Sequence, residues 1–144
     1  GVSIFLFLVA VLVRKPIQRR LRIRQIQRQH QLLLRKWERM LHEPDLVTRM
    51  ASLNSLWKSY LAPKDQIHLR SLTTTELKGK VKELAHLRSS QQEYLLEASK
   101  LGDKLIYAGQ SVSEKEIAQI ADQIAPIFDR ELKRRIEWVG NEGK

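Results

Sequence analysis

The chain opens on a run that is apolar at every position but one. Residues 2–13 contain a single polar side chain, Ser3, and Arg14-Lys15-Pro16 follows them directly. A helix that is hydrophobic all round is typical of a membrane span, and a buried core helix is the alternative. Twelve helical residues rise about 18 Å, whereas the hydrocarbon core of a bilayer is about 30 Å thick. We therefore expect residues 1–13 to be the C-terminal part of a transmembrane helix.

The next segment, residues 14–43, has the pattern of one long helix. Residues 17–42 contain no Gly or Pro and are rich in Arg, Gln and Leu, which favour helix. Pro16 fits the first turn of this helix, or a kink in a helix continuous with the span. Apolar residues become more frequent toward the end of the segment. They form a stripe that is able to dock on another surface: Leu33, Trp37, Met40 and Leu41.

Shorter amphipathic helices are predicted in residues 44–144. Apolar side chains recur at helical spacing over residues 46–61, 73–87, 91–107 and 114–139. The first of these helices ends at residues 62–65, and residues 66–72 form a short connection. Pro126 should kink or split the last helix, because proline lacks the N–H that an interior position needs.

Residues that favour helix ends lie between these helices. Asp45 is a candidate N-cap, and Gly109 suits a left-handed terminator. Two pairs have the spacing of a capping box: Thr73 with Glu76, and Ser113 with Glu116. No strand pattern is present. The predicted fold is all-α: a truncated transmembrane helix, a long basic juxtamembrane helix over residues 14–43, and a small four-helix domain over residues 44–144.

The positive charge of the chain is concentrated beside the apolar run. Residues 14–39 hold ten Lys or Arg and one acid, and so carry +9 of the net charge of +10. Residues 40–144 hold 16 basic and 15 acidic side chains and are nearly neutral. Because Lys and Arg flank spans on the cytoplasmic side, we expect the protein in a membrane with residues 14–144 cytoplasmic.

Nothing in the sequence marks a catalytic, metal or cofactor site. Cysteine is absent, and the six glycines are scattered rather than gathered in a phosphate-binding loop. The histidines are not clustered as zinc ligands are, and we expect them on the surface or at helix ends: His30, His42, His68 and His86. The sequence therefore predicts a protein that is not an enzyme, without cofactor or small-molecule substrate.

The basic residues nearest the apolar run are candidate contacts with anionic lipid: Arg14, Lys15, Arg19, Arg20 and Arg22. Each would add about 1 kcal/mol of attraction near an anionic surface. The alternatives are that these residues only set the membrane topology, or that they bind nucleic acid. Against nucleic acid, no aromatic side chain is interleaved with the basic residues before Trp37, and the rest of the chain is nearly neutral.

Most aromatic side chains fall at core spacing within the predicted helices. Those near the edges of the helical domain are better candidates for a partner surface, because aromatic residues often dominate the binding energy of interfaces. With the apolar residues beside them, they give the predicted partner-binding set: Trp37, Met40, Leu41 and Trp138.

Three short stretches carry a resemblance to a known family. They are Leu56-Trp57-Lys58-Ser59-Tyr60-Leu61, Leu72-Thr73-Thr74-Thr75-Glu76-Leu77 and Asp103-Lys104-Leu105-Ile106-Tyr107-Ala108. With the apolar run and the basic flank, they resemble the cytosolic tail of Bat-type aerotolerance membrane proteins over about residues 2–135. Members of that family are encoded alongside MoxR-type ATPases and von Willebrand A-domain proteins. The resemblance implies a non-catalytic subunit of the bacterial inner membrane whose cytosolic domain docks such a partner.

The sequence thus favours a membrane-anchored adaptor in contact with the lipid bilayer and with other subunits of a membrane complex, among them a MoxR-type ATPase. Two alternatives stay open. One is a structural subunit of a larger membrane machine, such as a secretion or motor assembly. The other is a membrane-tethered nucleic-acid binder, against which the neutral helical domain argues.

Overall fold

The computed structural model describes residues 2–61, 69 and 72–141. Its helices are α1 (Val2–Leu41), α2 (Leu46–Leu61), α3 (Thr74–Lys82), α4 (Ser89–Ile106) and α5 (Glu114–Asn141). No strand is present in these residues, which confirms the all-α class. The predicted helix end at residues 62–65 and most of the predicted connection at residues 66–72 lie outside the described residues.

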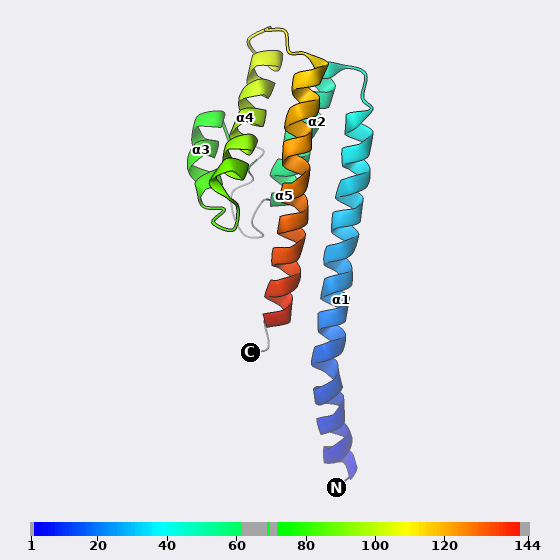
Figure 1. Ribbon diagram of the computed structural model, residues 1–144. Helices are drawn as coiled ribbons and strands as arrows, with labels where there is room; N and C mark the ends of the chain where they lie inside the picture. The colour runs from blue at the N-terminus through cyan, green and yellow to red at the C-terminus, as the bar shows by residue number, and fades with distance from the viewer. Residues whose placement is uncertain (1, 62–68, 70–71, 142–144) are drawn as a thin grey trace.

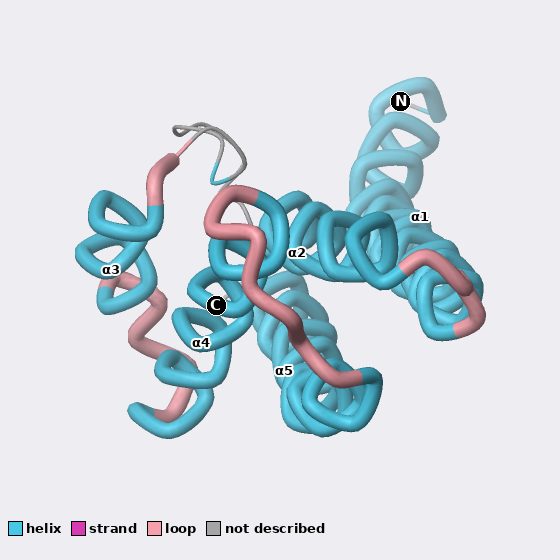
Figure 2. The backbone as a smooth tube through the Cα atoms, turned by 90° about the horizontal axis from the view of Figure 1, so that it is seen from above, coloured by secondary structure: helices cyan, strands magenta, loops and turns pink. Residues whose placement is uncertain are grey.

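Helices α1, α2, α4 and α5 form a bundle in which successive helices run in opposite directions (Figure 1). Both α1 and α4 pack against α2 and α5, and α2 also contacts α5. The short helix α3 packs on α4 at the outside of the bundle (Figure 2). Because α5 is antiparallel to α1, its C-terminal end points toward the same side as the N-terminal end of α1.

The C-terminal half of α1 supplies one of the four bundle helices. Its inward residues alternate at spacings of four and three, which keep one face of a helix toward its neighbours. We call this face the α1 seam; it consists of Arg19, Ile23, Ile26, His30, Leu33, Trp37 and Met40. The first three are half-buried and the last four are buried. The bundle therefore begins inside the segment predicted to be a separate juxtamembrane helix, and α3 is the helix left outside.

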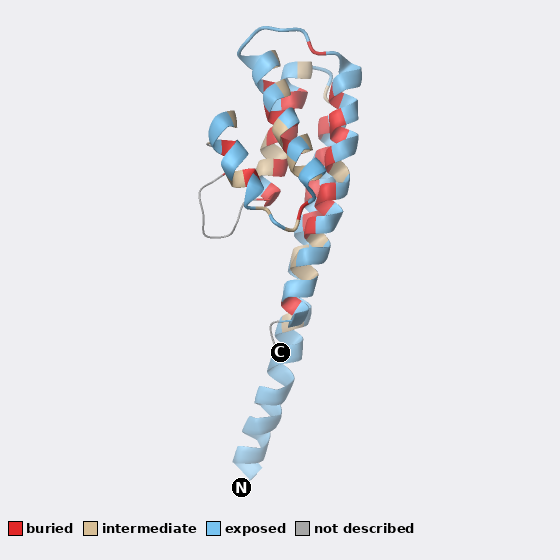
Figure 3. Cartoon of the chain, turned by 60° about the vertical axis from the view of Figure 1, so that its left-hand side comes forward, coloured by how far each residue is buried: buried red, intermediate tan, exposed pale blue. Residues whose placement is uncertain are grey.

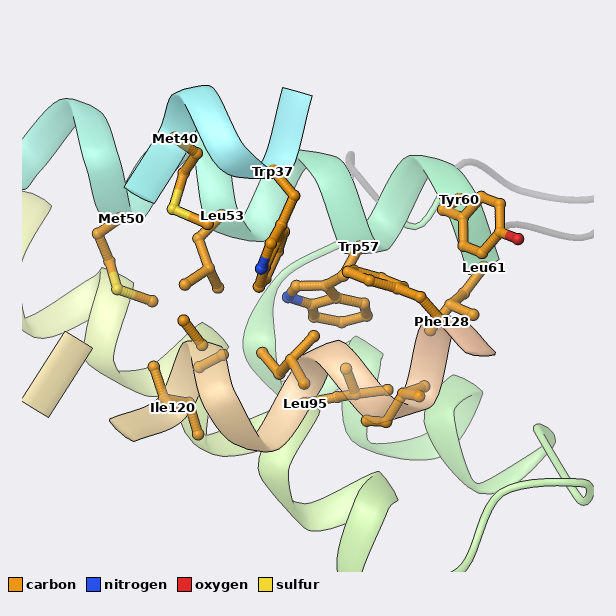
Figure 4. Close-up of a cluster of buried hydrophobic side chains, with 14 of the residues drawn as sticks. Trp37, Met40, Met50, Leu53, Trp57, Tyr60, Leu61, Leu95, Ile120 and Phe128 are labelled. Carbon is orange, nitrogen blue, oxygen red and sulfur yellow. The ribbon is translucent and has the colours of Figure 1, made fainter. Parts of the chain in front are cut away.

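Aromatic rings fill the centre of the bundle (Figure 4). Trp57 of α2 is fully buried. Trp37 of α1 meets Phe128 of α5 edge to face, with ring centroids 4.9 Å apart. Tyr60 of α2 meets the same ring edge to face at 5.6 Å. Each such pair contributes about 0.5–1.5 kcal/mol beyond the area that it buries, so α1, α2 and α5 are joined around one phenyl ring.

A buried amide links α2 to α4 beside these rings. The indole N–H of Trp57 donates to Asn54 Oδ1 at 2.8 Å, and Asn54 Nδ2 donates to the carbonyl of Ala98 at 3.0 Å. Gly102 of α4 lies against this amide, where an added Cβ would be 2.6 Å from Asn54 Nδ2. The close approach of α4 to α2 therefore favours glycine at this position, because a Cβ would displace the Asn54 amide.

The predicted N-caps and the left-handed glycine are confirmed, and each of the two predicted capping boxes shows its N-cap hydrogen bond. At three helix starts a side-chain oxygen accepts a hydrogen bond from the backbone N–H three residues on, at 3.1–3.3 Å: Asp45 from Thr48, Thr73 from Glu76, and Ser113 from Glu116. Gly109 has a φ of 60°, the left-handed conformation that glycine adopts without strain. The ends of α3 and α4 differ from prediction, since α3 stops at Lys82 and α4 already begins at Ser89.

Two helices run through a proline. α1 is continuous through Pro16, and α5 is continuous through Pro126. The prediction that Pro126 could split the last helix is therefore wrong. An interior proline costs about 3 kcal/mol through its lost hydrogen bond and its steric clash. Ile124 and Ile127 on either side of it are fully buried, and this packing holds α5 in one piece.

The N-terminal part of α1 extends beyond the bundle (Figure 3). Every residue from 2 to 18 is exposed, including Phe5 at 66% and Leu12 at 74%. Among the described residues, no helix combines the length and the apolar character that crossing a membrane requires. The all-α part of the predicted fold is thus supported, and the transmembrane part is not.

The Gly102 contact predicts opposite effects for two Gly-to-Ala substitutions. In Gly102→Ala the new Cβ presses on the Asn54 amide, so we expect the free energy of unfolding to fall by about 1–3 kcal/mol, as in other overpacked cores. Gly79→Ala on α3 is the matched control. Nothing lies within 4 Å of its added Cβ, and alanine should raise the free energy of unfolding by up to about 1 kcal/mol. Urea denaturation measures both; a Gly102→Ala protein as stable as the wild type would contradict the close approach.

Candidate functional site

A fully buried carboxylate lies at the centre of a charged cluster on α5. Glu131 is 1% exposed. Arg134 donates to it from Nε at 3.0 Å and from a terminal nitrogen at 2.7 Å, and Arg135 donates from Nε at 2.9 Å. Spacings of three and four residues place all three side chains on neighbouring positions of one helix surface. The buried charge is tolerated because both of its oxygens are paired with guanidinium groups.

This cluster reaches α2 and the segment between α3 and α4. His86 places Nε2 2.6 Å from Glu131 Oε2. The guanidinium of Arg135 lies over the ring of Tyr60, 4.4 Å from its centroid, and also donates to the Tyr60 backbone carbonyl. Arg135 thus ties α5 to the C-terminal end of α2 through both a cation–π contact and a hydrogen bond.

His30 extends these contacts to α1. Its ring is buried, with Nδ1 3.0 Å from the Tyr60 hydroxyl and Nε2 3.4 Å from Oδ1 of Asp129. The tautomer with its proton on Nε2 satisfies both contacts, because Nδ1 can then accept the hydroxyl proton of Tyr60. Side chains from α1, α2 and α5 therefore meet at one imidazole. The polar cluster, as we call it, consists of His30, Tyr60, His86, Asp129, Glu131, Arg134 and Arg135.

Two of the histidines are not where the sequence placed them. His30 is buried in the middle of α1, and His86 is half-buried against a charged side chain. Both have their carboxylate partners on α5, which is distant in the sequence. His42 is exposed at the end of α1, as predicted, and lies 2.9 Å from Glu38 one turn earlier. His68 lies outside the described residues.

Burial and charge act against each other in the polar cluster. Burial alone would raise the pKa of Glu131, but the hydrogen bonds and positive charges of Arg134 and Arg135 outweigh it and lower that pKa. Burial lowers the pKa of His86, and the negative charge of Glu131 only partly offsets it. Burial also raises the pKa of Tyr60. At neutral pH the cluster therefore holds an ionised glutamate beside a neutral histidine.

The arginine contacts of Glu131 limit what its carboxylate can do. Both oxygens of Glu131 already accept hydrogen bonds from arginine, so the carboxylate is poorly placed to take a proton from a substrate. Within residues 2–61, 69 and 72–141, no group of three or more His, Cys, Asp or Glu side chains is arranged to hold a metal ion. The one signal of the cluster visible in the sequence is the spacing of Glu131 to Arg134 and Arg135.

The predicted partner-binding residues do not form one surface. Trp37 and Met40 are buried, because the α1 seam docks inside the bundle. This internal packing corrects their assignment to a partner surface. Leu41 and Trp138 are exposed, Trp138 at 62%. They lie at opposite ends of the bundle, since α1 and α5 are antiparallel (Figure 1).

The predicted lipid-contact residues do lie together, on the part of α1 next to its apolar end. The side chains of Arg14, Lys15, Arg20 and Arg22 are exposed, and that of Arg19 is half-buried at the start of the α1 seam. The five positions span about 12 Å of helix, so their charges combine into one positive region.

The residues that carry the family resemblance are mostly structural. Trp57 and Tyr60 are buried in the core. Asp103 accepts a hydrogen bond from the Thr74 hydroxyl and so joins α4 to the start of α3. Tyr107, in contrast, is exposed at the end of α4 and is free of core packing.

Comparison of this chain with protein families, with curated proteins and with solved structures yields no match. Its function is therefore inferred from its own residues. The exposed apolar end of α1 and the basic region beside it are the strongest functional features, and the polar cluster holds the bundle to which they are attached.

The polar cluster predicts a loss of stability in acid. The lowered pKa of Glu131 gives a contribution that is present above its unfolded pKa of about 4.3 and is lost as the pH falls through the lower folded value. The lowered pKa of His86 acts in the same direction. Its contribution is complete above about pH 6.5 and declines below, as the buried ring is forced to take a proton. We expect urea denaturation to show the free energy of unfolding falling in two phases below pH 7.

Two variants separate these phases. His86→Gln should remove the upper phase. Glu131→Gln should remove the lower phase and also lower the free energy of unfolding at pH 7 by about 3 kcal/mol, because it removes the buried charge that pairs with Arg134 and Arg135. Glu137→Gln, which removes an exposed carboxylate from the same helix, controls for the loss of one charge. A wild-type stability that is constant between pH 7 and the acid range would overturn the assignment.

Proposed function

We propose that this protein is a non-catalytic membrane-anchored adaptor. The apolar end of α1 enters a lipid bilayer, and the helical bundle docks a protein partner on the cytoplasmic side. The observation that carries the proposal is the exposure of apolar side chains on every face of α1 over residues 2–13, directly followed by a basic region.

The apolar end of α1 is costly to leave in water. Side chains such as Phe5 and Leu12 are mostly exposed there, and apolar surface costs about 25 cal/mol for each Å² in contact with water. Exposed apolar patches of this extent mark membrane or protein interaction sites. As a continuous helix, residues 2–13 would reach about 18 Å into a hydrocarbon core of about 30 Å.

The basic region fits the headgroup layer that follows. Arg14 and Lys15 come directly after the last apolar residue, and Arg19, Arg20 and Arg22 lie within two turns of them. Anionic headgroups attract each such charge by about 1 kcal/mol. This bias also orients the bundle toward the cytoplasm, by the preference of Lys and Arg for that side.

The bundle supports the adaptor part of the proposal. Both oxygens of its buried carboxylate, Glu131, accept hydrogen bonds from arginine, while Trp138 and Leu41 remain exposed for contact with other proteins. The resemblance to Bat-type proteins favours a MoxR-type ATPase or an A-domain protein as the partner. An exposed Trp is a frequent centre of protein interfaces, because its large rigid ring buries much surface at little entropic cost.

Vesicle binding tests the anchor. We expect the full chain to float with vesicles that contain phosphatidylglycerol, and more weakly with purely zwitterionic vesicles. Replacing Phe5 and Leu8 by Asp should abolish flotation, because each charge costs about 2.5–3.5 kcal/mol inside a bilayer.

Replacing Lys15 and Arg20 by Glu should weaken binding to the anionic vesicles only. Gln110→Asp, at an exposed site between α4 and α5, is the control. Flotation of the Asp pair at the wild-type level would contradict the anchor.

Recovery of a partner tests the adaptor. The full chain, purified in mild detergent from its native cells, should carry one protein in fixed ratio, identified by mass spectrometry as an ATPase or an A-domain protein. Trp138→Ala should weaken that association by about 2 kcal/mol if the ring lies in the interface. Tyr107→Ala, which removes another exposed aromatic ring, is the matched control. Recovery of several multi-span proteins in fixed ratio, without such a partner, would favour the machine subunit instead.

A further inference from the structure

A groove runs between α1 and α2 on the surface of the bundle. It encloses about 580 Å³. The last two turns of α1 form one wall, with Lys36 and Arg39, and α2 forms the other. Because these residues come at the C-terminal end of α1, the groove lies at the opposite end of the bundle from the exposed apolar run (Figure 1).

The α2 wall is lined by small side chains. Ala51, Ser52 and Ser55 face the groove in its middle, and Val47 and Leu56 add apolar surface toward its ends. From Val47 to Leu56 the α2 backbone rises about 14 Å, or two and a half turns of helix. Small residues let a second helix pack at the usual separation of about 8–10 Å between axes. The dimensions therefore suit a helix of about three turns.

The groove is fixed before anything binds. At its closed end, Arg49 of α2 donates from Nε to the backbone carbonyl of Glu43 at 2.7 Å and from a terminal nitrogen to Glu114 of α5 at 3.1 Å. At its base, Met40 is buried as part of the α1 seam. Since α1 and α2 are held at a set angle, binding would not have to order the two walls.

The α1 wall adds positive charge that has no partner in the described residues. Neither Lys36 nor Arg39 forms an ion pair or a side-chain hydrogen bond with any residue that the structure describes, and both are exposed. The acid among the groove residues, Glu43, lies in the turn that closes the groove. A carboxylate of a bound partner would be attracted to Lys36 and Arg39, whereas a basic side chain would be repelled.

We propose that this groove binds an amphipathic helix of a partner protein that carries acidic side chains beside its apolar face. Apolar side chains at positions i, i+3 or i+4, and i+7 lie along Ala51 and Ser55 and reach Leu56. The acidic side chains lie on the other flank and pair with Lys36 and Arg39. This proposal rests on the proposed adaptor function and adds to it a docking surface and the chemistry of the partner.

The experiment uses the full chain in nanodiscs of zwitterionic lipid and a phage-displayed library of helical peptides. Each peptide has apolar residues at helical spacing, and its remaining positions are randomised among Glu, Lys, Gln and Ala. We expect selection to enrich peptides with more Glu than Lys. Their dissociation constants are then measured by fluorescence anisotropy on synthetic copies.

Two variants locate the binding site. Ala51→Trp places a large ring in the groove at an exposed position, and should weaken binding by roughly tenfold or more through steric exclusion. Lys36→Glu with Arg39→Glu reverses the charge of the wall without filling the groove, and should weaken binding of the acidic peptides by roughly tenfold or more. Arg24→Glu with Arg28→Glu makes the same change of charge on α1 outside the groove and should leave the dissociation constant unchanged.

Three results would overturn the proposal: no peptide enriched above the level seen with the Ala51→Trp protein, enriched peptides without excess Glu, or equal loss of affinity in both double charge reversals. Circular dichroism and a melting temperature near that of the wild type confirm that each variant is folded.

If the native partner is recovered but is released neither by Ala51→Trp nor by the Lys36 and Arg39 reversal, the groove proposal fails while the adaptor function stands. If no partner is recovered yet acidic peptides bind the groove, it is the adaptor function that lacks support.

Discussion

The docking of the α1 seam into the bundle is the interaction on which the rest of the structure depends. It buries Trp37 against Phe128. It also supplies the fourth helix of the bundle, a place that the short helix α3 does not fill. It also makes the exposed N-terminal part of α1 a direct extension of the folded core. One unbroken helix, with no linker, therefore joins the apolar end of α1 to the bundle.

The polar cluster restricts how this docking can occur. An apolar seam alone tolerates sliding by a helical turn, because leucine and isoleucine fit many neighbours. His30 must instead lie where both the Tyr60 hydroxyl and Asp129 can reach it. A register shift of α1 would leave the buried His30 ring and the Tyr60 hydroxyl without each other, at about 1–3 kcal/mol for each group. We interpret His30 as the residue that selects one register of α1 against α2 and α5.

The sequence predicts local structure well because helix ends are set by neighbours within four residues. Thr73 caps α3, and Gly109 takes the left-handed conformation, as their positions in the pattern indicate. Long-range packing is not visible in the same way. The partners of His30 and His86 are on α5, far along the chain, and no local spacing reveals them. The prediction of a split at Pro126 fails for the same reason. The buried residues beside it stabilise α5 by packing against other helices, which the local sequence does not show.

One helix carries both proposed contacts, and this fixes the distance between them. From the last apolar residue, Val13, to Lys36 in the groove, α1 rises about 35 Å. The basic region occupies the first part of that rise and the α1 seam the rest, so the partner helix would bind well beyond the headgroup layer. In this proposal the groove opens between α1 and α2 at the end of the bundle away from the bilayer, where a cytosolic protein would approach it. Because α1 is continuous through Pro16, the proposed spacing between membrane and partner would be a property of the fold rather than of a flexible tether.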